Sequence, residues 1–133
     1  MSAVFADTFY FLALLNDRDA AHNRAVAASR TPGLKLATTE FVLIELADAL
    51  CQPGQREEVL AMWNVVETDP AFQLIRVTPD LLQRGIQLFR DRRDKEWPLT
   101  DCISFVVMQE RGLTEALTAD RHFEQAGFKA LLA

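Results

Sequence analysis

The pattern of apolar and polar residues along the chain predicts a regular succession of short strands and helices. Short apolar runs bounded by polar or turn-forming residues predict five β-strands, at about residues 3–6, 34–37, 72–77, 115–119 and 128–132. Apolar residues at helical spacing fill the stretches between them and predict seven helices, at about residues 8–16, 18–30, 39–51, 55–68, 79–93, 100–111 and 121–126.

Some of these predicted helices have recognisable ends. Thr78, Pro79 and Asp80 supply an N-cap, a proline at the first helical position and an acid in the first turn. Gly112 and Gly127 stand where glycine commonly ends a helix. The capping residues therefore agree with the spacing of the apolar positions.

Strands that alternate with helices predict a parallel sheet, because parallel neighbours need a crossover connection, which is usually a helix. We therefore expect an α/β fold: a three-layer αβα sandwich with a mostly parallel central sheet of about five strands. No linker-like segment, repeat or low-complexity tract interrupts the sequence, so we expect residues 1–133 to form a single domain. In such folds ligands bind beyond the carboxyl ends of the strands, and residues just after a strand are the first candidates for a site.

Composition and charge exclude several classes of protein. The chain has 133 residues, of which half are apolar, and 19 acidic residues against 14 basic ones give a net charge of -5, which argues against a uniformly cationic nucleic-acid-coating protein. The two cysteines, Cys51 and Cys102, lie in apolar helical patterns and support neither a disulfide framework nor a zinc cluster. No apolar stretch is long enough to cross a membrane and the N-terminus has no signal-type pattern, so we expect a soluble, cytoplasmic protein.

Four carboxylates lie in unusually apolar sequence. Asp7 follows the first predicted strand and Asp120 the fourth, Asp101 begins a helix whose body is almost wholly apolar, and Glu45 interrupts the apolar helix 39–51. Each also has an ordinary explanation. Asp7, Asp101 and Asp120 could cap helices, and Glu45 could pair with a buried arginine.

These four acids can meet at the carboxyl edge of the predicted sheet. Carboxylates gathered in a cleft repel one another, and a bound hard divalent cation usually compensates this repulsion. Oxygen ligands without histidine or cysteine favour Mg²⁺ or Mn²⁺ over zinc. Such an ion held by carboxylates is a recurrent device for displacement at phosphorus, so the pattern predicts phosphodiester hydrolysis.

The segments around these acids resemble a known family. Phe5-Ala6-Asp7-Thr8, Thr38-Thr39-Glu40-Phe41-Val42-Leu43-Ile44-Glu45, Leu99-Thr100-Asp101-Cys102-Ile103-Ser104-Phe105 and Leu117-Thr118-Ala119-Asp120-Arg121-His122-Phe123 are similar, in order, to the motifs of PIN-domain ribonucleases, and specifically to VapC-type toxins of bacterial toxin–antitoxin pairs. The resemblance implies a PIN-like fold across nearly the whole chain and a Mg²⁺- or Mn²⁺-dependent endoribonuclease that leaves a 5′-phosphate and a 3′-hydroxyl.

The resemblance also implies a division of roles. Asp7 and Asp101 would be the main metal ligands, Asp120 a ligand of a second or water-bridged ion, and Glu45 the group that holds or deprotonates the attacking water. Thr8 and Ser104 would be hydroxyls supporting these ligands, unless they are ordinary capping or back-bonded hydroxyls.

Two features depart from the family pattern. Many relatives carry another acid two residues after the last aspartate, where this chain has His122, so a fifth acidic ligand is not expected and a part for His122 in the site stays open. The helix at 55–68 lies in a region that varies among such proteins, and nothing about substrate follows from it.

Other readings of the same residues are weaker. A hydrolase built from Ser104, His122 and Asp101 lacks a glycine-rich nucleophile turn, a phosphoacceptor domain would need paired acids after the first strand, and neither nucleotide-binding glycine fingerprint is present. The main alternative is a PIN-like domain that binds RNA or protein without cleaving RNA.

Partners follow from charge, apolar content and resemblance. The stretch with Arg84, Arg90, Arg92, Arg93 and Lys95 leads toward Asp101 and is the candidate RNA-binding surface, or else a solvated helix end. Apolar content, including nine phenylalanines, favours a homodimer, and the resemblance implies a cognate antitoxin that blocks the acidic cleft.

Overall fold

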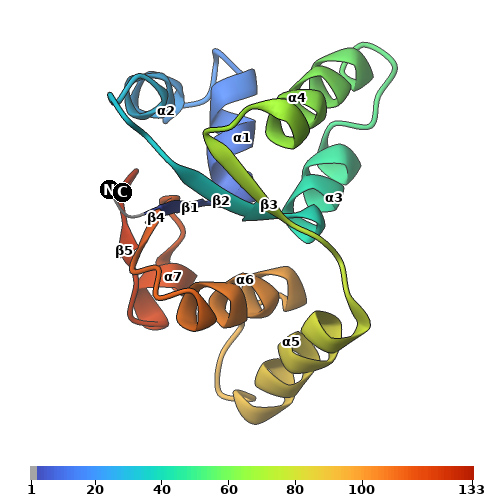
Figure 1. Ribbon diagram of the computed structural model, residues 1–133, viewed down its shortest axis with the longest axis vertical. Helices are drawn as coiled ribbons and strands as arrows, with labels where there is room; N and C mark the ends of the chain where they lie inside the picture. The colour runs from blue at the N-terminus through green and yellow to red at the C-terminus, as the bar shows by residue number, and fades with distance from the viewer. Residues whose placement is uncertain (1–2) are drawn as a thin grey trace.

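The computed structural model describes residues 3–133 as a five-stranded sheet with seven helices (Figure 1). The strands are β1 (Val4–Ala6), β2 (Leu36–Thr39), β3 (Phe72–Ile75), β4 (Glu115–Leu117) and β5 (Lys129–Ala130). The helices are α1 (Thr8–Leu15), α2 (His22–Ser29), α3 (Glu40–Ala49), α4 (Arg56–Thr68), α5 (Pro79–Asp91), α6 (Leu99–Glu110) and α7 (Arg121–Gln125). Residues 1 and 2 of the predicted domain lie outside the described residues.

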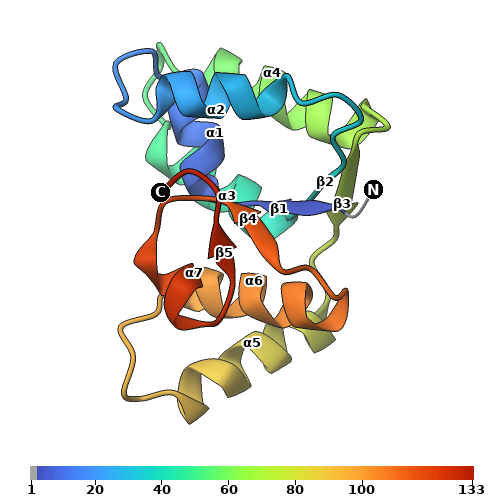
Figure 2. The ribbon, with the colours of Figure 1, turned by 90° about the vertical axis from the view of Figure 1, so that its left-hand side faces the viewer.

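The sheet has the strand order β3-β2-β1-β4-β5, and every pairing in it is parallel. Helices α1, α2, α3 and α4 lie on one side of it, and α5, α6 and α7 on the other (Figures 1 and 2). The predicted three-layer α/β sandwich with five strands is therefore confirmed, with a sheet that is parallel throughout.

Aromatic side chains fill the core on the α6 side of the sheet. Phe5, Phe105 and Phe123 are fully buried, and the rings of Phe105 and Phe123 meet edge to face at 4.9 Å. Trp97 packs edge-on against Phe105 at 5.0 Å. The Phe123 ring also lies 6.4 Å from that of Phe5, so these contacts hold α6 and α7 against β1, the strand that precedes Asp7.

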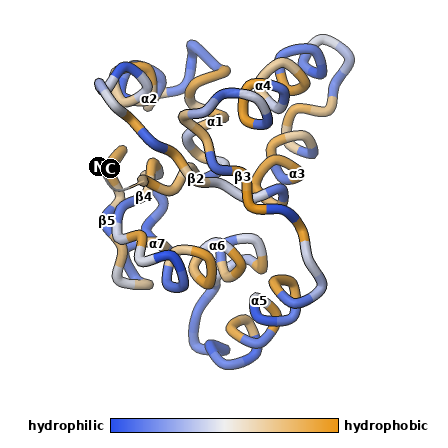
Figure 3. Tube along the Cα trace, viewed as in Figure 1, coloured by the Kyte–Doolittle hydropathy of each residue, from blue (hydrophilic) through white to orange (hydrophobic). Residues whose placement is uncertain are grey.

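Helix α5 lies outside α6 and packs closely on it. The close approach requires Gly85, because a β-carbon at that position would overlap Ile103 Cγ1 of α6. The connection from α5 to α6 is hydrophilic over most of its length (Figure 3) and leads to the N-terminus of α6.

The predicted caps at these helix ends are present. Thr78 Oγ1 accepts a 3.1 Å hydrogen bond from the Leu81 N–H at the start of α5. Gly112 and Gly127 have φ angles of 67° and 94°, in the left-handed region that glycine adopts without strain.

The predicted position of β2 was wrong by two residues and the predicted start of α2 by four. β2 runs from 36 to 39 and not from 34 to 37, because Gly33 turns the chain just before it and the β-branched Thr38 and Thr39 extend the strand. Helix α2 begins at residue 22 and not at 18, because the Asp19 carboxylate accepts a hydrogen bond from the Ala21 N–H and holds a turn there.

Strands β3, β4 and β5 end earlier than the sequence pattern predicted. β3 stops at Ile75, β4 at Leu117, and β5 is reduced to Lys129–Ala130.

Among residues 3–133, no helix combines the length and the apolar character that crossing a bilayer requires.

Candidate active site

The site lies where the order of the strands reverses. β1 sits between β2 and β4, so the chain leaves β1 to one side and returns to its other side only at β4. Asp7 comes directly after β1, and Asp120 follows β4 by three residues. Parallel sheets open a crevice at such a reversal, beyond the carboxyl ends of the strands.

Two further helices bring carboxylates to the same edge of the sheet. α3 starts directly after β2 and carries Glu45 in its second turn, and α6 carries Asp101 in its first turn. α3 and α6 contact each other past the sheet. Glu45 and Asp120 each lie near enough to raise the pKa of Asp101, and Glu45 also raises that of Asp7.

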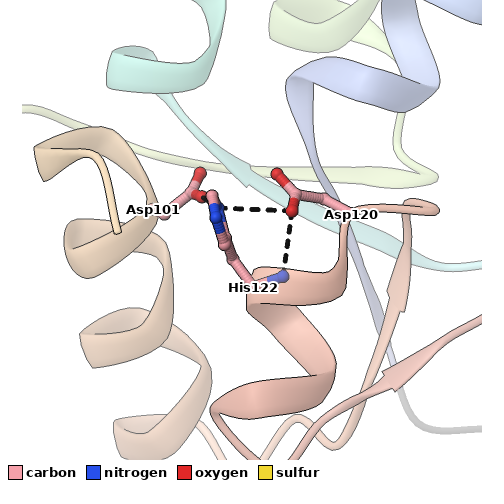
Figure 4. A group of neighbouring side chains, drawn as sticks. All are labelled: Asp101, Asp120 and His122. Atoms are coloured by element: carbon pink, nitrogen blue, oxygen red, sulfur yellow. Dashed lines mark hydrogen bonds and ion pairs between the residues drawn. The ribbon is translucent and has the colours of Figure 1, made fainter. Parts of the chain in front are cut away.

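Asp101, Asp120 and His122 form the tightest group in the site (Figure 4). His122 Nδ1 lies 3.0 Å from Asp101 Oδ2 and 3.3 Å from Asp120 Oδ1. One ligand atom from each residue falls within 4.8 Å of the others. The group joins the N-terminus of α6 to that of α7.

Asp7 is the most deeply buried acid of the four, with 4 % of its surface exposed. Thr118 Oγ1 donates a 2.9 Å hydrogen bond to Asp7 Oδ2. Burial raises the pKa of Asp7 to about 7, the charge of Asp101 and, more weakly, that of Glu45 raise it too, and the Thr118 hydrogen bond opposes them.

The pKa of Asp101 is also raised, but by less than that of Asp7. Burial raises its pKa to about 6, the hydrogen bond from His122 lowers it, and the charges of Asp120 and Glu45 raise it. Asp7 and Asp101 thus carry a cost for being ionised that a bound cation would remove.

Helix capping or a buried arginine partner could also explain these acids, and the structure shows such a role only for Asp120 among Asp7, Glu45 and Asp120. Asp120 does cap α7, since its Oδ1 accepts a 2.9 Å hydrogen bond from the His122 N–H. Asp7 makes no side-chain capping bond to α1. Among the described residues, Glu45 has no hydrogen bond or ion pair, so the buried arginine partner considered for it is not found.

The hydroxyls of Thr8 and Ser104 are buried, and neither has a hydrogen-bond partner within residues 3–133. They do not bond back to the helix or cap it, which was the ordinary reading. A buried hydroxyl left unpaired costs about 1–3 kcal/mol, so such groups usually serve water or a ligand. Ser104 lies one turn after Asp101, on the same face of α6.

The donor set fits a divalent ion. Carboxylate oxygens, one imidazole nitrogen and two unpaired hydroxyls lie at one end of the sheet, and burial and mutual repulsion raise the pKa values of Asp7 and Asp101. Divalent ions prefer such oxygen-rich clusters.

The candidate RNA-binding arginines separate into two places. Arg84 pairs with Asp80 and Glu110. Glu110 ends α6, so about 13 Å of helix separates it from Asp101. Arg92 forms a two-point ion pair with Asp94, and Arg93 Nε donates to the Arg90 carbonyl.

Arg92, Arg93 and Lys95 line a cavity of about 260 Å³ together with Phe89, Trp97 and Cys102. The Arg92 guanidinium lies over the Trp97 ring, 5.0 Å from its centre, and Phe89 is half exposed. Cys102 follows Asp101 directly, so this cavity reaches the N-terminal turn of α6 that also carries Asp101.

The sequence analysis gave no firm role to His122 and none to Thr118. His122 had one available signal: it follows the strand-end acid Asp120 by two residues, within the first turn of a helix. Thr118 had none, because its contact with Asp7 joins residues 111 positions apart.

A parallel α/β domain that gathers carboxylates at its strand reversal has the architecture of a metal-dependent phosphodiesterase. Residues 4–129 match the PIN domain family. The chain therefore belongs to the PIN-domain family.

Two comparisons support that placement. The chain is 31 % identical over 130 residues to the 23S rRNA-specific endonuclease VapC20 of Mycobacterium tuberculosis, an alignment that covers 94 % of this chain and 95 % of the relative. The crystal structure of M. tuberculosis VapC20, described as a sarcin–ricin loop cleaving toxin, superposes with a TM-score of 0.85 at 25 % identity, covering 95 % of this chain and 96 % of that one.

A more distant solved structure shares the fold alone. VapBC2 of Rickettsia felis, bound to a DNA fragment from its promoter, matches with a TM-score of 0.65 at 12 % identity, over 97 % of both chains.

Proposed function

We propose that this protein is a divalent-metal-dependent endoribonuclease that hydrolyses RNA phosphodiester bonds, and that it is the toxin of a type II toxin–antitoxin pair. The convergence of Asp7, Glu45, Asp101 and Asp120 at the carboxyl edge of the sheet carries the proposal. Membership of the PIN family and the likeness to VapC20 support it.

The resident ion is Mg²⁺ or Mn²⁺, with Asp7, Asp101 and Asp120 as its ligands. When bound, such an ion neutralises phosphate charge and promotes ionisation of an attacking water. Within residues 3–133, Glu45 is the one acid of the four without a hydrogen-bond or ion-pair partner, so it is free to orient that water and to accept its proton. Thr118 holds the Asp7 carboxylate in place, and the Thr8 and Ser104 hydroxyls support the ligands and their waters.

The α5–α6 connection holds the RNA. Arg90, Arg93 and Lys95 supply phosphate contacts, because no carboxylate pairs with them among the described residues. Arg92 is already neutralised by Asp94, so its exposed guanidinium face, fixed on Trp97, offers a flat surface on which a base can stack. The half-exposed Phe89 beside it offers a second one.

Substitution of the acids tests the proposal. Asp7→Asn and Asp101→Asn each remove a ligand charge while preserving side-chain shape, so we expect RNA cleavage with Mg²⁺ or Mn²⁺ to fall at least about 100-fold, as loss of catalytic electrostatic groups typically does. Ribosomal RNA is the first substrate to assay, given the relative's specificity. Asp17→Asn, an exposed acid elsewhere, is the matched control.

Two results would overturn this assignment. Folded Asp7→Asn or Asp101→Asn protein that cleaves as fast as wild type would exclude these acids from the reaction. Wild-type protein that binds RNA but leaves it intact with either ion would instead favour the non-cleaving PIN-like domain.

The same proposal extends to partners and location. Ile44 on α3 and Leu60 on α4 are 45 % and 60 % exposed, and Leu60 lines a cavity of about 300 Å³. Such apolar surface suits a homodimer contact or an antitoxin segment. An antitoxin that places a basic side chain against the acidic cleft would silence the enzyme, and both would act in the cytoplasm.

A further inference from the structure

We propose that His122 Nδ1 is a direct ligand of the ion held by Asp101 and Asp120, and that this nitrogen makes the site favour Mn²⁺ over Mg²⁺. The inference relies on the proposed function for the presence of an ion, and it assigns to His122 a place among the ligands.

The geometry of the three side chains supports direct ligation. Ligand atoms about 2.1 Å from one ion, at right angles to each other, lie about 3 Å apart. The Nδ1 distances of 3.0 Å to Asp101 Oδ2 and 3.3 Å to Asp120 Oδ1 match that spacing. Figure 4 shows the imidazole directed between the two carboxylates from the start of α7.

The imidazole is positioned by its own backbone. The His122 N–H donates to Asp120 Oδ1, which places His122 in the first turn of α7 and turns its ring toward α6. The side chain is 17 % exposed, so the ring is largely shielded from solvent. A ligand aspartate and its neighbouring histidine are thus fixed by one capping hydrogen bond.

A second, independent observation marks the same place as a ligand site. The Ser104 hydroxyl is fully buried and lacks a partner within residues 3–133, and it stands one turn along α6 from Asp101. The Thr8 hydroxyl, beside Asp7, is likewise buried and without a partner among the described residues. Both hydroxyls are available to hydrogen-bond water molecules bound to the ion.

The choice of ion follows from ligand chemistry. Mg²⁺ prefers oxygen ligands and gives up its waters reluctantly, whereas transition-metal ions accept imidazole nitrogen readily. Replacing a carboxylate by an imidazole therefore costs Mg²⁺ more affinity than it costs Mn²⁺.

The chain offers a clean test because it has only two histidines, His22 and His122. His22 lies in α2 on the other side of the sheet, and its Nδ1 is 2.8 Å from the Ala13 carbonyl. Pulsed electron paramagnetic resonance of Mn²⁺ bound to the full-length protein reports nitrogen nuclei that are directly coordinated. We expect a nitrogen coupling in wild type and in the control His22→Asn, and its loss in His122→Asp.

Competition between the two ions provides the second readout. Titration of Mn²⁺ binding against Mg²⁺ gives the ratio of their affinities, which we expect to fall on the order of tenfold in His122→Asp and to stay unchanged in His22→Asn. His122→Asn, with a neutral side chain of smaller size, should also lose the nitrogen coupling, and circular dichroism verifies the fold of each variant.

The possible outcomes separate this inference from the proposed function. Mn²⁺ bound without nitrogen coupling in wild type, or an unchanged Mn²⁺/Mg²⁺ ratio in folded His122→Asp, would overturn the role of His122 while leaving a metal-dependent nuclease intact. Absence of binding by either ion would overturn both.

Discussion

Asp7 shows how one side chain can serve a site at the expense of stability. Its carboxylate is buried near two other acids, and the hydrogen bonds from the Thr118 hydroxyl and the Thr8 backbone do not offset that burial. The folded metal-free protein therefore holds the Asp7 proton more tightly than the unfolded chain does. As far as this group is concerned, its stability is highest below pH 3.8 and falls as the pH rises from there to about 7.

Asp7→Asn should therefore stabilise the metal-free protein at neutral and higher pH. With a pKa of 3.8 in the unfolded chain and about 7 in the folded protein, the gain at pH 8 is on the order of 4 kcal/mol, and it should vanish near pH 4. Urea denaturation in the presence of a chelator at pH 4, 6 and 8 measures it. Equal gains at all three values, or the same gain in Asp17→Asn, would contradict the role given to the Asp7 charge.

At this scale the sequence revealed the acids but not their contacts. Asp7 and Glu45 could be singled out because a carboxylate amid apolar residues is costly wherever the chain folds. The Thr118 hydrogen bond and the position of the His122 ring depend on how β4 and α7 are placed in three dimensions, and no local pattern encodes that. The sequence analysis grouped Arg84 with Arg92 by charge alone. In the structure, ion pairs with Asp80 and Glu110 hold Arg84 away from Arg92.

Helix α5 depends on one glycine for its packing. Gly85→Ala would place a β-carbon against Ile103 and push the α5–α6 pair apart, at a cost of about 1–3 kcal/mol. Urea denaturation should show this loss, and the loss should be smaller in an Ile103→Ala background, which lacks the clashing Cγ1 atom. Gly54→Ala is the control, because nothing lies within 4 Å of the added β-carbon. Equal effects of the two glycine substitutions would exclude the close helix contact as the cause.

The α5–α6 connection allows a prediction about RNA binding. Arg92→Ala combined with Arg93→Ala removes a stacking surface and a phosphate contact, so RNA affinity should fall about tenfold or more and its salt dependence should flatten. Fluorescence anisotropy with an Asp101→Asn background, from 50 to 200 mM salt, measures both. Arg84→Ala, whose charge is paired far along α6, should change neither. A similar loss in Arg84→Ala would indicate general charge attraction.

Elements were predicted well where caps and turns act locally, and less well where tertiary contacts extend them. The Thr78 cap and the glycines at 112 and 127 set helix ends through bonds within a few residues. β2 continues through Thr38 because the hydroxyl of that residue donates to the Ala6 carbonyl of the neighbouring strand. That contact exists only once the sheet has formed.

The whole molecule should be stabilised by the ion that its site is built to hold. An ion present at 100 times its dissociation constant adds about 2.7 kcal/mol to the free energy of unfolding, equivalent to a rise in Tm of roughly 5–10 °C for a chain of this size. Thermal melts with Mn²⁺ and with a chelator, at constant ionic strength, measure the shift. Asp101→Asn should lose most of it, and a shift of wild-type size in that variant would place the ion elsewhere.

The reversal of strand order also determines when the enzyme can become active during its own synthesis. Asp7 and Asp120 lie 113 residues apart in the sequence, yet they follow neighbouring strands. A nascent chain therefore has an incomplete set of carboxylates until β4 has been translated and paired with β1. A fragment that ends before residue 120 lacks one of the four carboxylates proposed for the site, so we expect it to have no nuclease activity.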